Sequence, residues 1–282
     1  MTSTMVRARA SAIDMPESGL SVEAIRRELT GTTIGQLLHV YGVIDSTNAR
    51  LARLARAGAP DGTVVIADEQ TAAHGRRGTV WFSPPGVNLY VSVLFRRPLT
   101  IKAVPLFACI TSLALVDAAE ELGVHPVIKW PNDVLVDRKK VGGTRVECAM
   151  RGAAVDYLIL GVGANLNVTA AELHAALGPA GGFATSLGAL TGGVIDRNAF
   201  AAAYLRNLDE WAQIYEARGA PTILAAWRDR DILGGRRVDV READGGGYQG
   251  RVLDMDAGGA LVVLDTRGRR HEVTTGEVRL AD

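Results

Sequence analysis

Residues 75–84 read Gly-Arg-Arg-Gly-Thr-Val-Trp-Phe-Ser-Pro and residues 129–133 read Lys-Trp-Pro-Asn-Asp, and both stretches interrupt a regular apolar pattern. Glycines let a backbone approach a ligand, and arginines bring permanent charge, so residues 75–78 suit a phosphate or carboxylate and can close over an anion. A lysine and an aromatic ring beside a Pro-Asn turn can present a charge and a stacking face together. The alternative for residues 75–78 is a basic surface loop, and the alternative for residues 129–133 is an ordinary Asx turn.

The pattern on either side of these stretches predicts an α+β fold, with a mixed, mostly antiparallel sheet and flanking helices. Alternation places Leu89, Val91 and Val93 on one face of a strand. The Ala- and Gly-rich residues 169–193 are expected to form a short helix and loops. Strands are expected at residues 40–44, 63–67, 88–95, 127–130, 134–137, 143–150 and 156–161, and helices at 21–29, 45–58, 105–122, 198–217 and 222–228.

The character of the chain changes after residue 233. Short alternating apolar runs follow, separated by Gly-rich turns such as residues 256–259, and this pattern is typical of a small β-barrel. We therefore expect an N-terminal tail with a short helix (1–30), a catalytic domain (31–233) and a C-terminal β domain (234–282).

Composition narrows the class of protein. Hydrophobic residues make up 48% of 282 residues, which is enough for a sizeable core. Equal numbers of basic and acidic residues, 31 of each, do not favour a nucleic-acid binder. The two cysteines, Cys109 and Cys148, suit a reducing cytoplasm, and the apolar runs predict no membrane span.

Other candidate residues are ambiguous when taken alone. Lys140 lies in the charged run 137–140, and nothing local distinguishes it from Lys139. Residues 161–165, Gly-Val-Gly-Ala-Asn, permit close backbone approach at a strand end but lack the dinucleotide fingerprint. The five histidines are scattered, so we predict no metal site built by the protein itself.

Taken together, the polar segments resemble the biotin protein ligase family in order and spacing, over residues 34–280. The ordered set is far more specific than any one member. The matching segments are residues 45–48, 69–72, 75–78, 81–84, 129–133, 140–143 and 163–165.

The resemblance implies a class II synthetase-like catalytic domain followed by an SH3-like barrel. It implies that the biotin carboxylate attacks the α-phosphate of ATP, with Mg²⁺ assisting, to give biotinyl-5′-AMP. A lysine of a biotin carboxyl carrier domain, from acetyl-CoA carboxylase or a related carboxylase, would then accept biotin. The protein would be cytoplasmic, with no DNA or membrane partner, and a homodimer is left open.

The resemblance also assigns roles to residues. Lys140 and Arg76 would be catalytic, and Mg²⁺ would arrive with ATP, with Asp133 as its candidate ligand. Biotin would be bound by Ser46, Thr47, Asn48, Gln70, His74, Gly75, Arg76, Lys140 and Gly163. ATP would be bound by Arg77, Trp81, Lys129, Asn132, Asp133 and Asn165.

This chain departs from the family pattern at two places. Ala73 and His74 stand where the family loop usually has Gly-Arg, so a flexible residue and a permanent charge are lost. Thr144 and Arg145 replace two aliphatic residues. Alternate residues of a strand share a face, so we expect Arg145 to pair with Glu147.

Two other functions remain as alternatives. One is a lipoate ligase or octanoyl transferase on a related fold, which residues 81–84 and 129–133 argue against. The other is a non-catalytic biotin or nucleotide sensor, which the substituted positions suggest. About 33 residues precede the matched core, too few for a helix-turn-helix module, so we expect ligase activity without repression.

Overall fold

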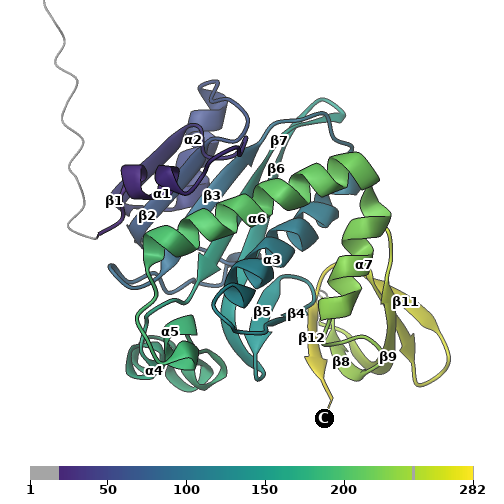
Figure 1. Cartoon of the computed structure of the whole chain (residues 1–282). Helices are drawn as coiled ribbons and strands as arrows, with labels where there is room; N and C mark the ends of the chain where they lie inside the picture. The colour runs from purple at the N-terminus through teal and green to yellow at the C-terminus, as the bar shows by residue number, and fades with distance from the viewer. Residues whose placement is uncertain (1–18, 243–244, 282) are drawn as a thin grey trace, which may run out of the picture.

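A seven-stranded mixed sheet forms the centre of the larger unit in the computed structural model, which describes residues 19–242 and 245–281 (Figure 1). The strand order is β1-β2-β3-β7-β6-β5-β4; β1 and β2 pair in parallel and the other neighbours are antiparallel. The predicted α+β class is therefore confirmed, whereas the expected tail up to residue 18 lies outside the described residues. The strands are Leu38–Ile44 (β1), Val64–Gln70 (β2), Leu89–Phe95 (β3), Val127–Lys129 (β4), Asp133–Val136 (β5), Lys139–Arg151 (β6) and Ala154–Ala164 (β7).

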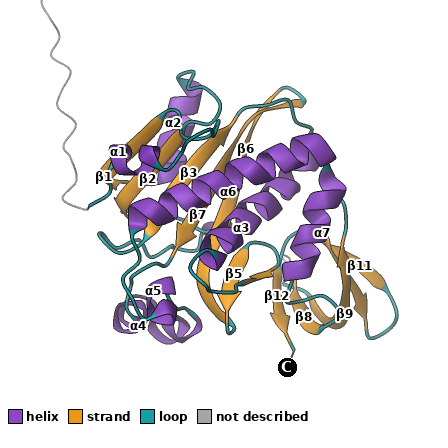
Figure 2. Ribbon diagram, viewed as in Figure 1, coloured by secondary structure: helices purple, strands orange, loops and turns teal. Residues whose placement is uncertain are grey.

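Helices cover both faces of this sheet. Helices α3 (Val104–Glu120) and α6 (Arg197–Arg218) run side by side across one face, and α7 (Ala220–Arg230) continues from α6 toward the C-terminal unit (Figure 2). Helix α2 (Thr47–Arg56) packs on the opposite face. The side chains of strand β3 point alternately to the two faces. Val91 and Val93 belong to the larger core, while Leu94 belongs to the core under α2. All seven residues of β3 are buried for this reason.

Helix α3 is the core helix of the domain. The segment Ile101–Glu120 is long and apolar enough to cross a membrane by length and composition alone. However, 12 of the 17 residues of α3 are buried against the sheet and neighbouring helices. Its composition is therefore explained by packing, and Cys109 is a buried thiol within it.

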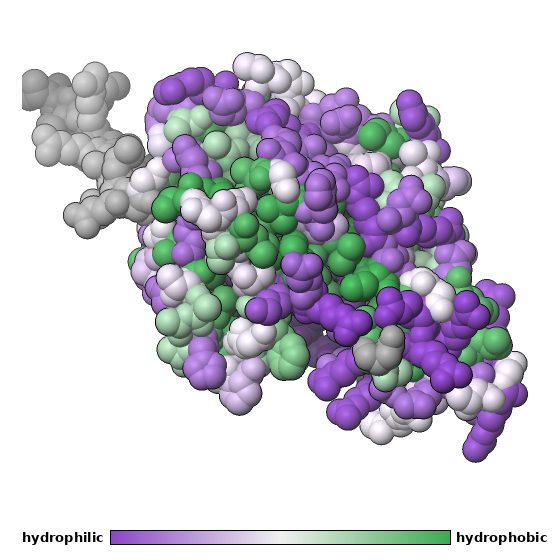
Figure 3. All heavy atoms as spheres, turned by 60° about the horizontal axis from the view of Figure 1, so that its bottom comes forward, coloured by the Kyte–Doolittle hydropathy of each residue, from purple (hydrophilic) through white to green (hydrophobic). Residues whose placement is uncertain are grey.

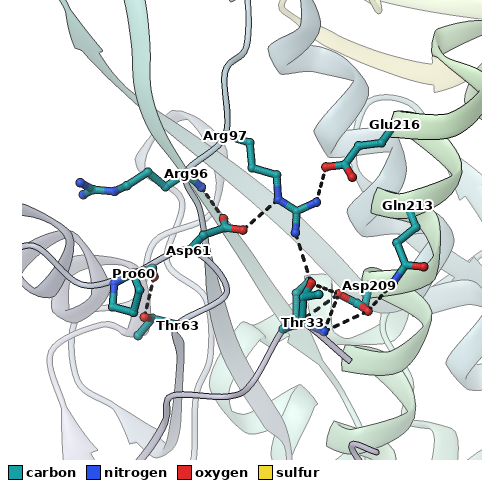
Figure 4. A network of polar contacts seen from close by, with 10 residues as sticks. Thr33, Pro60, Asp61, Thr63, Arg96, Arg97, Asp209, Gln213 and Glu216 are labelled. Carbon is teal, nitrogen blue, oxygen red and sulfur yellow. Dashed lines mark hydrogen bonds and ion pairs between the residues drawn. The ribbon is translucent and has the colours of Figure 1, made fainter. Parts of the chain in front are cut away.

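Polar side chains fix α6 to the N-terminal part of the domain (Figure 4). The buried Asp209 carboxylate accepts hydrogen bonds from the Thr33 hydroxyl (2.6 Å), the Ile34 amide (3.2 Å) and Gln213 Nε2 (2.7 Å). Arg97 bridges Asp61 (2.8 Å) and Glu216 beside this group. Because buried polar groups are costly when unpaired, this network specifies how the helix lies. The N-terminal helix α1 (Val22–Arg27) begins at its predicted cap, Ser21.

Residues 169–193 are more regular than the prediction of a short helix and loops. They form α4 (Ala170–Leu177), a 3₁₀ turn (Gly178–Phe183) and α5 (Leu187–Thr191). A capping box explains α4, because Thr169 and Glu172 each accept a hydrogen bond from the backbone of the other. The Thr-x-x-Glu spacing was present in the sequence, but the surrounding alanines and glycines obscured it.

The C-terminal unit is all-β, as predicted, but its strand pairing is that of an open sheet. The order is β11-β10-β9-β8-β12, and no pairing joins the edge strands β11 and β12 within the described residues. The expected closed barrel is therefore corrected. The strands are Arg237–Arg241 (β8), Gly247–Met255 (β9), Leu261–Asp265 (β10), Arg270–Val273 (β11) and Glu277–Leu280 (β12).

The two sheets are in contact. Trp130 Nε1 donates to the Gly259 carbonyl (3.0 Å), and Arg228 of α7 pairs with Asp254 (2.6 Å). One cluster of buried apolar residues extends into both units. We still propose a boundary near residue 233, since α7 ends at Arg230 and the second sheet starts at Arg237. Hydrophilic side chains predominate on the side of this second sheet, and apolar ones are more frequent beside α4 and α5 (Figure 3).

Candidate active site

Every residue predicted for the site lines one cavity of about 410 Å³. The cavity lies where the start of α2, the end of β2, residues 73–82 and strands β4 to β7 meet. Residues 276–278 of the C-terminal unit also reach it. The predicted positions therefore converge in space although they are spread over 120 residues of sequence.

At the α2 end of the cavity, polar side chains are bonded to one another. Gln70 Oε1 accepts from the Thr47 amide (2.9 Å), and Gln70 Nε2 donates to the Ser83 hydroxyl (3.1 Å). Ser92 Oγ lies 2.8 Å from Thr47 Oγ1 and 2.6 Å from Asn48 Oδ1. Ser46 is the N-cap of α2. A small ligand with amide-like donors and acceptors would find a preformed set of partners here.

Two glycines of β7 allow side chains to lie directly on that strand. A Cβ at Gly161 would stand 2.2 Å from Asn48 Oδ1, and one at Gly163 would stand 2.5 Å from the Trp81 ring. Trp81 Nε1 is buried and has no hydrogen-bond partner in the described part of the chain. The missing side chains at Gly161 and Gly163 therefore leave room for Asn48 and Trp81 in the cavity wall. The sequence had indicated only that the backbone could be approached closely here.

The Gly-Arg loop is a short hairpin-like turn. His74 bridges Val80, the Gly75 amide donates to the Thr79 carbonyl (2.7 Å), and Arg77 adopts a left-handed conformation (φ 56°). Non-glycine residues rarely adopt this conformation, which costs of order 1–3 kcal/mol and is concentrated at functional sites. We infer that the loop is shaped for a ligand rather than for local stability alone.

The Arg76 guanidinium lies 5.9 Å from the centre of the Trp130 ring. Burial, followed by the nearby charge of Arg77, lowers the pKa of Arg76, and Asp133 opposes the shift. Arg76 stays charged at neutral pH because its ordinary pKa is so high. An anionic ligand in the cavity would therefore stabilise this half-buried cation.

Tertiary contacts distinguish Lys140 from its neighbour. Lys139 is exposed, whereas Lys140 Nζ lies 2.5 Å from Asp133 Oδ1 and 5.1 Å from the centre of the Trp81 ring. Asn132 holds this corner together, because its Nδ2 donates to the Thr144 carbonyl (2.6 Å). A cation with a shared carboxylate and an aromatic face beside it suits a phosphate or carboxylate group.

Some predicted residues have structural bonds inside the cavity wall. Asn165 Nδ2 donates to the Thr185 carbonyl (3.0 Å), and the Thr185 amide donates in turn to the Lys140 carbonyl of β6 (2.9 Å). These bonds hold the segment after α4 against β6. The sequence analysis missed that segment and the C-terminal edge, neither of which carried a recognisable motif. The missed lining residues of α4, of the segment after it and of the C-terminal edge are Leu173, Leu177, Ala180, Phe183, Ala184, Gly276, Glu277 and Val278.

The predicted pairing of Arg145 with Glu147 is confirmed, with 2.9 Å between Arg145 Nε and Glu147 Oε1. Arg145 Nη1 also donates to the carbonyls of His74 and Gly75, so the side chain joins β6 to the loop. Glu147 in turn accepts from Asn48 Nδ2 (2.9 Å). The substituted position is thus connected to both the loop and the polar end of the cavity.

The cavity wall offers few groups for a metal. Within residues 19–242 and 245–281, no three His, Cys, Asp or Glu side chains cluster in a way that could hold an ion. Asp133 contributes one carboxylate, which Lys140 shares. One carboxylate suits Mg²⁺ that is bound mainly by substrate phosphates.

Comparison with known proteins shows the family of this chain. Residues 40–165 match the Biotin/lipoate A/B protein ligase family. The biotin–[acetyl-CoA-carboxylase] ligase of Mycobacterium tuberculosis is 34% identical over 267 residues, covering 92% of this chain and 95% of the relative. The bifunctional ligase/repressor BirA of Bacillus subtilis is 31% identical over 250 residues, covering 88% and 76% respectively.

A solved structure supports the same grouping. The biotin protein ligase from Aquifex aeolicus in complex with biotin and ATP superposes with a TM-score of 0.71 at 26% identity, covering 87% of this chain and 98% of that one. By sequence and by fold, this chain therefore belongs to the biotin protein ligase family.

Proposed function

We propose that this protein is an ATP-dependent biotin protein ligase that forms biotinyl-5′-AMP and then transfers biotin to a lysine of a carrier domain. The observation that carries the proposal is the convergence of all the predicted biotin and ATP residues on one cavity. A relative of similar fold is a biotin protein ligase in complex with both biotin and ATP.

The charge distribution of the cavity suits the first reaction. A carboxylate and a triphosphate repel one another, so a site that joins them needs cations between them. Arg76, Arg77, Lys129 and Lys140 line the cavity together with two carboxylates. Asp133 pairs with Lys140 and Glu277 pairs with Arg279, so the carboxylates neutralise only part of this charge. We assign the polar side chains around Asn48 to the biotin ring and the cationic side to the nucleotide.

In the proposed first step, a biotin carboxylate oxygen forms a bond to the α-phosphorus of ATP, and the bond to pyrophosphate breaks. Lys140 would contact both the carboxylate and the α-phosphate, so its ammonium would offset the charge that develops between them. Mg²⁺ bound to the phosphates would supply further charge neutralisation, with Asp133 as its candidate protein ligand.

In the second step, the neutral amine of the carrier lysine attacks the carbonyl carbon of the mixed anhydride, and AMP leaves with its phosphate charge. The amine loses a proton and an amide forms. Water would compete for the same carbon, so the adenylate must be enclosed. We assign this enclosure to residues 73–81, with His74, Gly75 and Arg76 over the reacting groups.

The proposed acceptor is the biotin carboxyl carrier domain of acetyl-CoA carboxylase or a related carboxylase. Support comes from the name of the Mycobacterium tuberculosis relative, a biotin–[acetyl-CoA-carboxylase] ligase. We also propose a cytoplasmic location, which the two free cysteines suit. We propose no DNA binding, because the formal net charge is zero. A gel-shift assay with DNA tests the last point, since another relative is a ligase/repressor.

One assay separates this function from its alternatives. The protein is incubated with Mg-ATP, labelled biotin and a biotin carrier domain, and label on the carrier lysine is measured. Transfer of biotin supports the proposal. Transfer of lipoate without biotin would indicate a lipoate ligase, and biotin binding without adenylate formation would indicate a sensor.

A further inference from the structure

We propose that Arg145 is a positioning residue that clasps residues 73–81 onto strand β6, so that the loop is ordered before a substrate binds. The assignment of this loop as the cover of the reacting groups rests on the proposed function. The clasp itself rests only on contacts between protein atoms.

The contacts of Arg145 join the loop to its own strand, β6. Its Nη1 donates to the carbonyl oxygens of His74 (3.0 Å) and Gly75 in the loop. Its Nε pairs with Glu147 two residues along the same strand (2.9 Å). A planar guanidinium can hold these three acceptors at once because its N–H groups form a fixed fork. An aliphatic side chain at this position could not do so.

Glu147 makes the clasp electrically neutral and connects it to the cavity. Its Oε1 also accepts from Asn48 Nδ2 (2.9 Å), and Asn48 Oδ1 accepts from Ser92 (2.6 Å). The loop is therefore coupled to the polar end of the cavity through Arg145, Glu147 and Asn48. A substitution that breaks this series of hydrogen bonds should therefore change how long a molecule enclosed by the loop is retained.

The loop also has backbone hydrogen bonds of its own. The Gly75 amide donates to the Thr79 carbonyl (2.7 Å), and the Trp81 amide donates to the Ala73 carbonyl (3.0 Å). Both carbonyls that Arg145 holds lie at the start of this turn. Without the guanidinium, the turn would keep these internal bonds, the contact of Arg76 with Trp130 and the packing of Trp81 on Gly163, but the His74 and Gly75 carbonyls would lose their link to β6.

Limited trypsin digestion tests the clasp, because Arg76 and Arg77 are cleavage sites inside the loop. Cleavage after these residues is followed by mass spectrometry in the protein without biotin or ATP. Arg145→Leu should accelerate it about tenfold, since charge-assisted hydrogen bonds of this kind contribute on that scale. The control is Arg151→Leu on the same strand, which removes an exposed arginine paired with Asp156 and should leave the rate unchanged.

An acceleration smaller than about threefold in Arg145→Leu, when the melting temperature is unchanged, overturns the clasp. If that variant does not fold, hydrogen exchange on the unmodified protein decides. Protection of the Gly75 and Trp81 amides by about tenfold or more supports the clasp, and exchange faster than this overturns it. Neither readout uses biotin or ATP, so a failure of the ligase proposal is distinguishable from a failure of the clasp.

A kinetic readout separates positioning from general stability. In the protein loaded with biotinyl-adenylate, Arg145→Leu should raise the rate of adenylate release about tenfold, as expected for the loss of roughly 1.4 kcal/mol. Arg151→Leu should release it at the unmodified rate. Equal release rates for Arg145→Leu and the unmodified protein would contradict the role of Arg145 in retention.

Discussion

Gly161→Ala is the sharpest test of the cavity geometry. Gly161 lies on β7 directly beneath Asn48, and a Cβ there would stand 2.2 Å from Asn48 Oδ1 and 3.0 Å from its Cγ. These distances are too short for any real contact, so Asn48 must move. Asn48 is only 8% exposed and begins a packed helix, so it cannot swing into solvent.

The cost follows from the bonds that Asn48 would lose. It accepts from Ser92 Oγ at 2.6 Å and donates to Glu147 Oε1 at 2.9 Å. Each such bond contributes about 1 kcal/mol, and the bond to the charged partner contributes more. We expect Gly161→Ala to lower the free energy of unfolding by about 2 kcal/mol. If the displaced Asn48 also loses one hydrogen bond to biotin, worth about 1.4 kcal/mol, the Kd for biotin should rise roughly tenfold.

Isothermal titration with biotin, together with a thermal melt, measures both consequences. Gly193→Ala is the matched control, because a Cβ there meets nothing within 4 Å. The control should bind biotin as the unmodified protein does. A Gly161→Ala variant that folds and binds biotin with an unchanged Kd would refute the assignment of Asn48 to the biotin ring.

Three further predictions follow from single residues. Lys140→Ala should nearly abolish adenylate formation, measured as pyrophosphate release, while the melt is unchanged; an unmodified rate would refute its role. Asp209→Ala should lower the free energy of unfolding by about 2–4 kcal/mol in urea, because several donors lose their acceptor; an unchanged midpoint would contradict this. Burial raises the pKa of Asp231 from 3.8 to about 6, so its contribution to stability is present below 3.8 and is lost as pH rises through 6. Asp231→Asn should therefore stabilise the protein by about 2 kcal/mol at pH 7.5 but not at pH 4, and an equal gain at both values would exclude this cause.

Local patterns predicted most of the architecture. Apolar alternation located the sheet strands to within a few residues, and the cap at Ser21 located α1. The segment 169–193 was underestimated because its capping box was embedded in residues of weak preference. The C-terminal strands were predicted, but closure depends on whether distant edge strands meet, and local alternation carries no information on that.

The sequence by itself identified the family, because its residue types stand in a characteristic order, and every residue that it assigned to the site lines the cavity. Tertiary structure alone decided how those residues act on one another. It turned Lys140 toward Asp133 while leaving Lys139 exposed, and it laid Trp81 on Gly163. It also connected Arg145 to a loop seventy residues away. Charge and shape are encoded along the chain, but hydrogen bonds depend on distances of about 3 Å that only the folded arrangement sets.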